Sequence, residues 1–430
     1  MRALKENAVF RAIGANFGWL VADKLMRLLV GLLVSAWVAR YLGPEQFGIL
    51  AYALTFIAIF QAISLLGLDS LVVRNLSANP SLAHKYLGTV VRMRGVGAVS
   101  SYTLLLIFAI ILHPDERETL ELIALAGLGL FFQVSDVVDI WFQSQLQSRR
   151  TVLAKGVSYL LTASIKVSLI LAGAGILAFA AANAIEAALA LIAMVVSYRL
   201  FQTPEKWCWS KSIAIELLKQ CWPLLLSGLS ILLYMRVSVI FLRETAGDTA
   251  VGIYTVGAAL SELWYFIPMA LASSLAPYVS RKRVEDRDAY QRLIVRVFSG
   301  MWLFSFAVAI FNALTSQYWV AILYGEQYSE SANVFSVHSF TFIPVCLGVM
   351  QSIWLINEGR SALALYQALA GAAAALTLNY FLIPIYGAYG AAIATVISQF
   401  IQAFLVNAIL APDLFRLQYK SLLFSNSIKS

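Results

Sequence analysis

Residues 28–39 read Leu-Leu-Val-Gly-Leu-Leu-Val-Ser-Ala-Trp-Val-Ala, an uncharged apolar run with no alternation between apolar and polar positions. A strand of an outer-membrane barrel would alternate over about ten residues, whereas a helix that crosses ~30 Å of hydrocarbon needs about twenty largely apolar residues. Similar runs recur along the chain of 430 residues, which is 60% apolar and 13% charged. The sequence therefore predicts an all-α polytopic membrane protein.

Charge clusters and Gly or Pro breaks divide the chain into twelve predicted transmembrane helices. They lie near 12–39, 47–68, 87–112, 119–145, 152–172, 177–201, 217–242, 251–280, 293–315, 334–357, 361–384 and 387–411. Lys and Arg are unevenly placed, because 22 of the 31 lie in the terminal tails and alternate connections, and only three in the other connections. The excess of positive residues marks the cytoplasmic side, so both termini are predicted to be cytoplasmic. This distribution also explains the net charge of +8, and no nucleic-acid partner is expected.

Two glycine motifs suggest an internal duplication. Gly43-Pro-Glu-Gln-Phe-Gly48-Ile49 precedes the second span, and Gly247-Asp-Thr-Ala-Val-Gly252-Ile253 precedes the eighth, 204 residues later. Gly173-Ala-Gly175 and Gly387-Ala-Tyr-Gly390 form a looser echo before the sixth and twelfth spans. We therefore expect two six-helix bundles, related as parallel repeats, around a central cavity. The predicted divisions are an N-terminal bundle at 1–201, a cytoplasmic linker at 202–216, a C-terminal bundle at 217–411 and a cytoplasmic tail at 412–430.

Basic residues within the spans are the first candidates for a binding site. A Lys or Arg at the bilayer centre costs roughly 2.5–3.5 kcal/mol on insertion scales, so several of them suggest a polar cavity. Arg27 has an acid four residues before it and could pair within its own helix. Arg92 and Arg94 lie near the cytoplasmic end of a span, point to different faces and could instead anchor at the head groups. The candidates are Lys24, Arg27, Arg92, Arg94, Lys166 and Arg236.

Acidic residues within the spans are candidates for ion coupling. A carboxylate shielded from water can carry a proton or coordinate sodium, so H⁺- or Na⁺-coupled antiport is one hypothesis. Pairing with basic neighbours is the alternative, and the three-residue spacing of Asp136 and Asp139 suits either a shared ion or one lysine. Glu186 and Glu262 have no partner on their own helix. The candidates are Asp23, Asp136, Asp139, Glu186 and Glu262, and no pattern predicts a catalytic group, a metal site or a bound cofactor.

Several segments, in order along nearly the whole chain, resemble one family. Arg40-Tyr-Leu-Gly-Pro-Glu-Gln-Phe-Gly48 is similar to the R-Y-L-G-P-x-x-F-G signature of the bacterial polysaccharide transport family, which belongs to the multidrug/oligosaccharidyl-lipid/polysaccharide exporter superfamily. Softer similarities are Gly67-Leu-Asp-Ser with Arg74, Asp136 to Arg150, Gly252-Ile-Tyr with Pro268 and Pro277, Tyr324-Gly-Glu, and Ile383 to Thr395. The related lipid II flippases usually have fourteen spans, so the twelve predicted here count against that branch.

The resemblance implies a function. Members of this family are flippases that move an undecaprenyl-pyrophosphate-linked oligosaccharide, such as an O-antigen repeat unit for lipopolysaccharide, from the cytoplasmic to the periplasmic leaflet of the bacterial inner membrane. The implied partners are this lipid-linked oligosaccharide, the lipid bilayer, a polysaccharide polymerase and a chain-length regulator. Lys24, Arg27 and Lys166 would meet the pyrophosphate, because cations bind phosphate strongly where little water screens them.

Two other functions fit the hydropathy. A multidrug or cation antiporter of the same superfamily would favour an acidic cavity, yet five basic residues face four acids within the first six spans. A membrane polymerase or ligase acting on lipid-linked sugars would be expected to have a long periplasmic loop with catalytic residues, and no predicted loop exceeds about twenty residues. We therefore expect a transporter rather than an enzyme.

Overall fold

The computed structural model describes the backbone of residues 2–200 and 206–423, with side chains from Gly18 onward. Every regular element in these residues is helical, which confirms the all-α prediction for the described chain. By its internal contacts the chain divides into two compact units. Unit 1 comprises Met1–Leu42 and Ala53–Gly228, and unit 2 comprises Gly43–Tyr52 and Leu229–Ser430.

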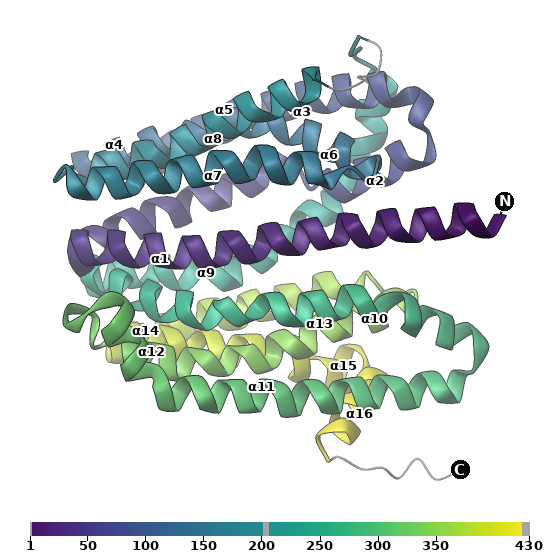
Figure 1. Cartoon of the computed structure of the whole chain (residues 1–430). Coiled ribbons are helices and arrows are strands. Elements are labelled where there is room, and N and C mark those ends of the chain that lie inside the picture. The colour runs from purple at the N-terminus through teal and green to yellow at the C-terminus, as the bar shows by residue number, and fades with distance from the viewer. Residues whose placement is uncertain (1, 201–205, 424–430) are drawn as a thin grey trace. The chain divides into compact units, whose positions relative to one another are not determined.

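Two long helices, α1 (Arg2–Leu65) and α9 (Lys211–Glu262), contribute residues to both units. The other helices of unit 1 are α2 (Asp69–Ala78), α3 (Ala83–Leu112), α4 (Arg117–Gly127), α5 (Gly129–Phe132), α6 (Asp136–Ser144), α7 (Ser148–Leu171) and α8 (Ile176–Arg199) (Figure 1). Those of unit 2 are α10 (Phe266–Glu285), α11 (Arg287–Tyr324), α12 (Ser331–His338), α13 (Phe342–Asn357), α14 (Leu363–Phe400), α15 (Asn407–Leu410) and α16 (Pro412–Leu422). Tight 3₁₀ turns are η1 (Pro80–Leu82), η2 (Gln133–Ser135), η3 (Leu263–Tyr265), η4 (Glu326–Tyr328) and η5 (Ser339–Thr341), and η6 (Ile401–Leu405) is a π-helical turn.

Each unit has its own core. In unit 1, α8 packs on α7 and α4, while α2 packs on α6. A cluster of buried apolar side chains joins α2, α3, α6 and the start of α9, and includes Leu71, Val90, Ile140 and Leu217. In unit 2, α11 contacts α12, α13 and α16, in the green to yellow part of Figure 1. The core there includes Phe298, Trp302, Phe342, Leu347 and Trp354.

Nine helical stretches of the described chain are long and apolar enough to cross a membrane. Three of them, Gly18–Ala78 with 61 residues, Lys211–Glu285 with 75 and Leu363–Leu410 with 48, are more than twice as long as the about twenty residues that one crossing requires. Each of these three contains a glycine with non-helical backbone angles, so each consists of two arms. The arms and the remaining stretches together are compatible with the twelve predicted spans, and the polytopic membrane class is confirmed.

The Gly-x4-Gly-Ile motifs make the same turn at both places. Gly43 has φ 75° and ψ 169°, and Gly247 has φ 82° and ψ 175°. Side chains disfavour this region of positive φ, so glycine is required where one helical arm ends and the next begins. Pro44 then occupies the first turn of the new arm, where its fixed φ and missing N–H fit a helix start.

The second glycines of the two motifs allow a close reciprocal contact within unit 2. A Cβ atom on Gly48 would overlap the carbonyl oxygen of Asp248, and a Cβ on Gly252 would overlap the carbonyl oxygen of Pro44. Equivalent positions of the two motifs therefore face each other, as two copies of one motif would. Only residues without a side chain permit this approach of the two backbones.

The signature residues after the first arm of α1 are held by side chains of unit 2. The Phe47 ring lies edge-on to Tyr328, with 6.4 Å between the ring centroids. Arg243 places its guanidinium carbon 4.2 Å from the centroid of the Tyr52 ring and forms an ion pair with Asp248 at 2.8 Å. Arg243 follows the predicted span 217–242 and is therefore expected in a connection, whereas its side chain is 6% exposed.

The boundaries of the two packed units lie at other residues than the domain boundaries expected from the sequence. The start of α9 as far as Gly228 packs with unit 1, because Leu217 and Cys221 belong to the same core as Leu71. Within the predicted linker α9 already begins at Lys211, and 202–205 lie outside the described residues. The predicted tail contains α16, which packs against α11, and 424–430 lie outside the described residues. Sequence breaks mark chain reversals, whereas units form where apolar faces meet.

The reciprocal glycine contact gives a first prediction. We expect Gly48→Ala and Gly252→Ala each to destabilise the protein by about 2 kcal/mol or more, because the new methyl group meets a backbone carbonyl that cannot turn away. Thermal unfolding of the purified protein in detergent, followed by loss of the monodisperse peak in gel filtration, measures this. Gly300→Ala is the matched control, since nothing lies within 4 Å of its Cβ position. Unfolding temperatures equal to the wild type for both variants would contradict the contact.

Candidate functional site: a charged cluster in unit 1

Three helices of unit 1 bring together charged side chains that the sequence placed on separate spans. Asp23 and Arg27 lie on α1, Tyr159 and Lys166 on α7, and Glu186 on α8. The helices α1 and α7 approach closely because glycines replace side chains between them. Gly31 of α1 faces the Tyr159 hydroxyl, and Gly156 of α7 faces Met26 and Asp23.

Arg27 is held from three directions. Its Nε lies 3.0 Å from Asp23 Oδ2, the i, i+4 pair expected from the sequence. Its guanidinium carbon lies 4.9 Å from the centroid of the Tyr159 ring, and the Tyr159 hydroxyl donates a hydrogen bond of 3.0 Å to the Arg27 carbonyl oxygen. Arg27 Nη2 is buried and has no hydrogen-bond partner among the described residues. The pair with Asp23 therefore leaves part of the guanidinium's donor capacity unused.

Lys166 and Glu186 complete the cluster. Lys166 Nζ donates a hydrogen bond of 3.1 Å to Asn183 Oδ1, and Asn183 Nδ2 donates one of 2.8 Å to the Phe179 carbonyl oxygen. The Glu186 carboxylate interacts electrostatically with both Lys166 and Arg27. Glu186, which has no partner on its own helix, is therefore brought by the tertiary structure close enough to the cations of α1 and α7 to interact with them electrostatically.

The cluster nearly balances its own charge while staying accessible. Arg27 and Lys166 face Asp23 and Glu186, and Lys24 adds a further positive charge on the exposed side of α1. The side chains of Arg27 and Asp23 are 30% and 21% exposed. An anionic ligand could replace either carboxylate beside the cations, and the released carboxylate could then take up a proton or a metal cation.

Arg94 lies apart from this cluster, in the interior of unit 1. Its side chain is 1% exposed, and Nη2 forms an ion pair with Asp69 Oδ1 at 2.7 Å. Its Nε and Nη1 have no hydrogen-bond partner among the described residues. The sequence allowed Arg94 to reach the head groups, and the structure places it in the core instead, because it points to the opposite side of α3 from Arg92.

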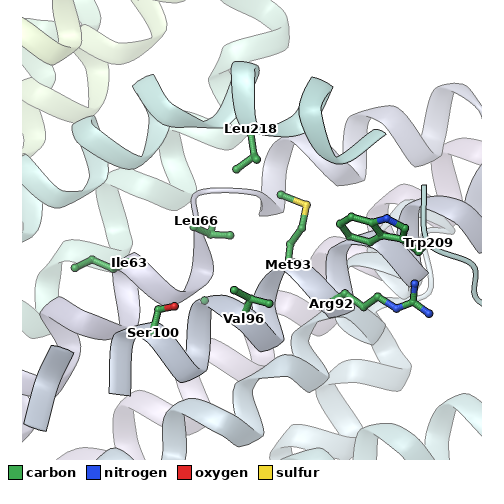
Figure 2. Close-up of a pocket in the computed structure, with 9 residues that line it drawn as sticks. Ile63, Leu66, Arg92, Met93, Val96, Ser100, Trp209 and Leu218 are labelled. Atoms are coloured by element: carbon green, nitrogen blue, oxygen red, sulfur yellow. The ribbon is translucent and has the colours of Figure 1, made fainter. Parts of the chain in front are cut away.

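Arg92 lies at the edge of an apolar pocket of about 600 Å³ in unit 1. Its guanidinium carbon is 5.9 Å from the centroid of the Trp209 ring. Figure 2 shows Arg92 and Trp209 at one end of the pocket and Ile63 and Ser100 at the other. Between them lie the apolar side chains of Leu66, Met93, Val96 and Leu218. This arrangement agrees with the expectation that Arg92 and Arg94 face different ways.

Asp136 and Asp139 share one lysine. Lys155 Nζ lies 2.7 Å from Asp136 Oδ1 and 2.8 Å from Asp139 Oδ2. Of the two alternatives left open by their spacing, the structure shows the partner lysine. Lys155 falls near the start of the predicted span 152–172, and because α7 begins at Ser148 it lies two turns inside the helix.

Arg236 and Glu262 form the corresponding pair of unit 2. Arg236 Nη2 lies 3.4 Å from Glu262 Oε2, and the two side chains are 36% and 24% exposed. Glu262 is the last residue of α9, directly before the turn η3. Each residue therefore has a partner, which lies 26 residues away in the chain.

The structure thus joins Arg27, Asp23, Lys166 and Glu186 in one site. Five other candidates lie in separate ion pairs, namely Arg94, Asp136, Asp139, Arg236 and Glu262. Arg92 lies beside Trp209, and Lys24 lies on the exposed side of α1. Sequence reasoning missed the contribution of Tyr159, because an aromatic residue in a membrane span carries no signal of its own. It also missed Asp69, the partner of Arg94, and Lys155, whose position near a span end concealed its depth.

Comparison with known proteins identifies a family and a relative of this chain. The sequence pattern of the family described as "Polysaccharide biosynthesis protein" matches residues 13–283, more than half of the chain. The chain belongs to the polysaccharide biosynthesis protein family. This result confirms the resemblance found in the sequence. One relative is the capsular polysaccharide biosynthesis protein CapF of Staphylococcus aureus. It is 22% identical to this chain over 406 residues, which cover 90% of this chain and 96% of CapF.

Solved structures show which fold this polysaccharide biosynthesis protein has. An inward-facing multidrug resistance MATE family transporter of the MOP superfamily aligns with TM-score 0.72 and 16% identity, over 92% of this chain and 96% of that one. The lipid II flippase MurJ in an inward closed conformation aligns with TM-score 0.73 and 13% identity, over 94% of this chain and 90% of MurJ. The family member therefore has the fold of MOP superfamily transporters.

The Arg94–Asp69 pair of this polysaccharide biosynthesis protein gives a second prediction. We expect Asp69→Asn to destabilise the protein by about 3 kcal/mol, because it leaves a charged guanidinium buried without its partner. Arg94→Met should change stability by less than about 1 kcal/mol, because Asp69 is 56% exposed and keeps its hydration. Thermal unfolding in detergent compares the two variants. A larger drop in unfolding temperature for Arg94→Met than for Asp69→Asn would contradict the prediction. It would show that Asp69 does not stabilise the protein by neutralising the buried charge of Arg94.

Proposed function

We propose that this protein is a flippase that moves an undecaprenyl-pyrophosphate-linked oligosaccharide, the repeat unit of a surface polysaccharide such as O-antigen, between membrane leaflets by alternating access. The polysaccharide biosynthesis family and the transporter fold support the class of function. The observation that carries the proposal is the accessible pair of cations, Arg27 and Lys166, inside membrane-spanning helices of unit 1.

A pyrophosphate fits these two cations by charge and by geometry. Arg27 offers a planar fork of donors, of which Nη2 has no partner among the described residues. Lys166 offers a compact charge that donates a hydrogen bond to the neutral amide of Asn183. Phosphate oxygens would give both residues charge-assisted hydrogen bonds, which are about twice as strong as neutral ones. Lys24 would add long-range attraction from the exposed side of α1, and Arg92 a contact near the apolar pocket of Figure 2.

The carboxylates beside the cations suggest how transport could be coupled to an ion. When the pyrophosphate takes over Arg27 and Lys166, Glu186 and Asp23 lose their positive neighbours and become better sites for H⁺ or Na⁺. Departure of the lipid restores the internal pairs and releases the ion. Asp136, Asp139 and Glu262, each already paired with a base, would take part only if conformational change breaks those pairs.

The distribution of Lys and Arg along the sequence suggests the membrane topology in which this function takes place. We place the protein in the bacterial inner membrane with both termini in the cytoplasm, and transport runs from the cytoplasmic to the periplasmic leaflet. The lipid-linked unit would then pass to a polysaccharide polymerase and its chain-length regulator.

A transport assay in cells gives a third prediction. In a polysaccharide-producing host whose own gene is deleted, we expect Arg27→Ala and Lys166→Ala each to reduce surface polymer about tenfold or more, at normal protein level. One lost charged hydrogen bond to phosphate, about 1.5–3 kcal/mol, accounts for a change of this size. Polymer is measured on the cell surface, and lipid-linked repeat units are measured in membrane extracts, where they should accumulate.

Arg117→Ala is the matched control, since Arg117 is 92% exposed and pairs only with Glu121. It should leave surface polymer unchanged. Normal surface polymer after deletion of the gene itself would overturn the flippase proposal. Loss of drug resistance in the deletion strain, with polymer intact, would instead indicate an antiporter.

A further inference from the structure

A second site candidate lies within unit 2, near the Arg236–Glu262 pair but lined by neither of these two residues. It is a pocket of about 300 Å³, at the lower end of the ~300–1,000 Å³ typical of small-ligand pockets. Its walls come from α9, η3, α10, α13, α14 and the π-helical turn η6. The polar and aromatic side chains that line it are Tyr234, Tyr265, Gln351, Ser352, Gln367, Gln399 and Gln402.

No acidic or basic side chain lines this pocket. The described lining residues are apolar, aromatic, amide or hydroxyl groups, so the pocket lacks the cations that a phosphate needs and the carboxylates that a cationic drug needs. Because most of the lining is apolar, the fitting class is a neutral ligand that combines an apolar face with hydrogen-bonding groups. Side-chain amides both donate and accept, as sugar hydroxyls do, and aromatic side chains offer apolar faces to a sugar ring.

Gln399 supplies the observation that points to a missing partner. The residue is 4% exposed, and its Oε1 is buried with no hydrogen-bond partner among the described residues. A buried amide oxygen without a partner costs about 1–3 kcal/mol, and such groups are rare in folded proteins. A ligand hydroxyl in the pocket would satisfy this oxygen.

The wall behind Gln399 is rigid, because a closed network of amides fixes it. Gln351 Nε2 donates to Gln367 Oε1 at 2.8 Å, Gln367 Nε2 donates to Asn407 Oδ1 at 2.7 Å, and Asn407 Nδ2 donates to Gln351 Oε1 at 2.7 Å. Gln418 of α16 joins the same network through Asn407. These amides are satisfied within the fold, which distinguishes them from Gln399. A satisfied network holds neighbouring groups in place.

Gln402 is brought to the pocket by an irregular turn and a missing side chain. It belongs to the π-helical turn η6, and such turns occur often at functional sites. Its Cβ would lie 2.8 Å from a Cβ built on Gly371, and Tyr234 Cδ1 would lie 3.6 Å from the same point. Glycine at 371 therefore makes room for Gln402 and Tyr234 side by side.

We propose that this pocket of unit 2 is a sugar-binding subsite, in which Gln399 and Gln402 hydrogen-bond hydroxyls of one sugar and Tyr234 and Tyr265 cover its apolar face. The inference rests on the proposed flippase function and deepens it. The pocket of unit 2 would recognise the sugar part of the proposed substrate. Specificity for a repeat unit then depends on uncharged residues of the second half of the chain.

The test compares two ligands with the purified full-length protein in nanodiscs. The first ligand is the undecaprenyl-pyrophosphate-linked oligosaccharide extracted from the producing host, and the second is undecaprenyl pyrophosphate without sugar. We expect the wild type to bind the sugar-bearing lipid at least about tenfold more tightly than the sugar-free lipid. One good hydrogen bond to a buried amide accounts for a difference in affinity of this size. Gln399→Leu should lose about tenfold in affinity for the sugar-bearing lipid and keep its affinity for the sugar-free lipid.

Stability gives an independent readout of the same variant. Because Gln399→Leu removes a buried oxygen without a partner, its unfolding temperature without ligand should equal or exceed that of the wild type. A loss of binding therefore could not be ascribed to misfolding. Gln317→Leu is the matched control, an exposed glutamine of α11 outside the pocket, and should bind both lipids as the wild type does.

The outcomes separate the two proposals. If the wild type and Gln399→Leu prefer the sugar-bearing lipid equally, or if the wild type binds both lipids equally, the sugar subsite is wrong and the flippase proposal stands. If the wild type binds neither lipid, the flippase proposal fails and the subsite with it. A tenfold loss in Gln399→Leu confined to the sugar-bearing lipid supports the subsite.

Discussion

A charged side chain within a membrane-spanning helix must find compensation where it lies, because no bulk water is available to supply it. This constraint organises the polar contacts of unit 1. Asp23 meets Arg27, Lys155 meets both Asp136 and Asp139, and Arg94 meets Asp69. In unit 2 the Arg236–Glu262 pair follows the same rule. Each pair links neighbouring turns or different helices, so the compensation of charge also fixes how helices lie within a unit.

The constraint also separates structural charges from candidate functional ones. Arg94 is fully buried with one carboxylate, and Lys155 holds two, so these bases are engaged within the fold. Arg27 differs from the buried Arg94 because its side chain is 30% exposed, and Lys166 differs from Lys155 because its hydrogen bond goes to a neutral amide instead of two carboxylates. A ligand that replaces their internal partners changes the charge balance of the whole cluster. Under the proposed function, ligand binding and ion uptake would then be coupled by electrostatics.

Backbone geometry sets the second condition of the fold. Gly43 and Gly247 turn the chain with positive φ, and Gly48 and Gly252 let the backbones of the two motifs touch. The segment from Gly43 to Tyr52 consequently packs into unit 2, although it follows the first helical arm of the chain. The signature from Arg40 to Gly48, which served in the sequence as a mark of the family, thus has a physical role in helix turning and close packing.

The sequence by itself determined the helical class, the approximate spans, the turn glycines and the i, i+4 pair of Asp23 and Arg27, because each depends on residues close together in the chain. Tertiary structure alone decided that Glu186 meets Lys166 and Arg27, that Lys155 serves Asp136 and Asp139, and that Arg94 is buried against Asp69. The same holds for the neutral pocket around Gln399, whose lining comes from separate helices and whose amides give no signal in composition. The physical reason is that hydropathy and spacing fix which segments enter the membrane, whereas the face that each helix turns toward its neighbours depends on packing between helices far apart in sequence.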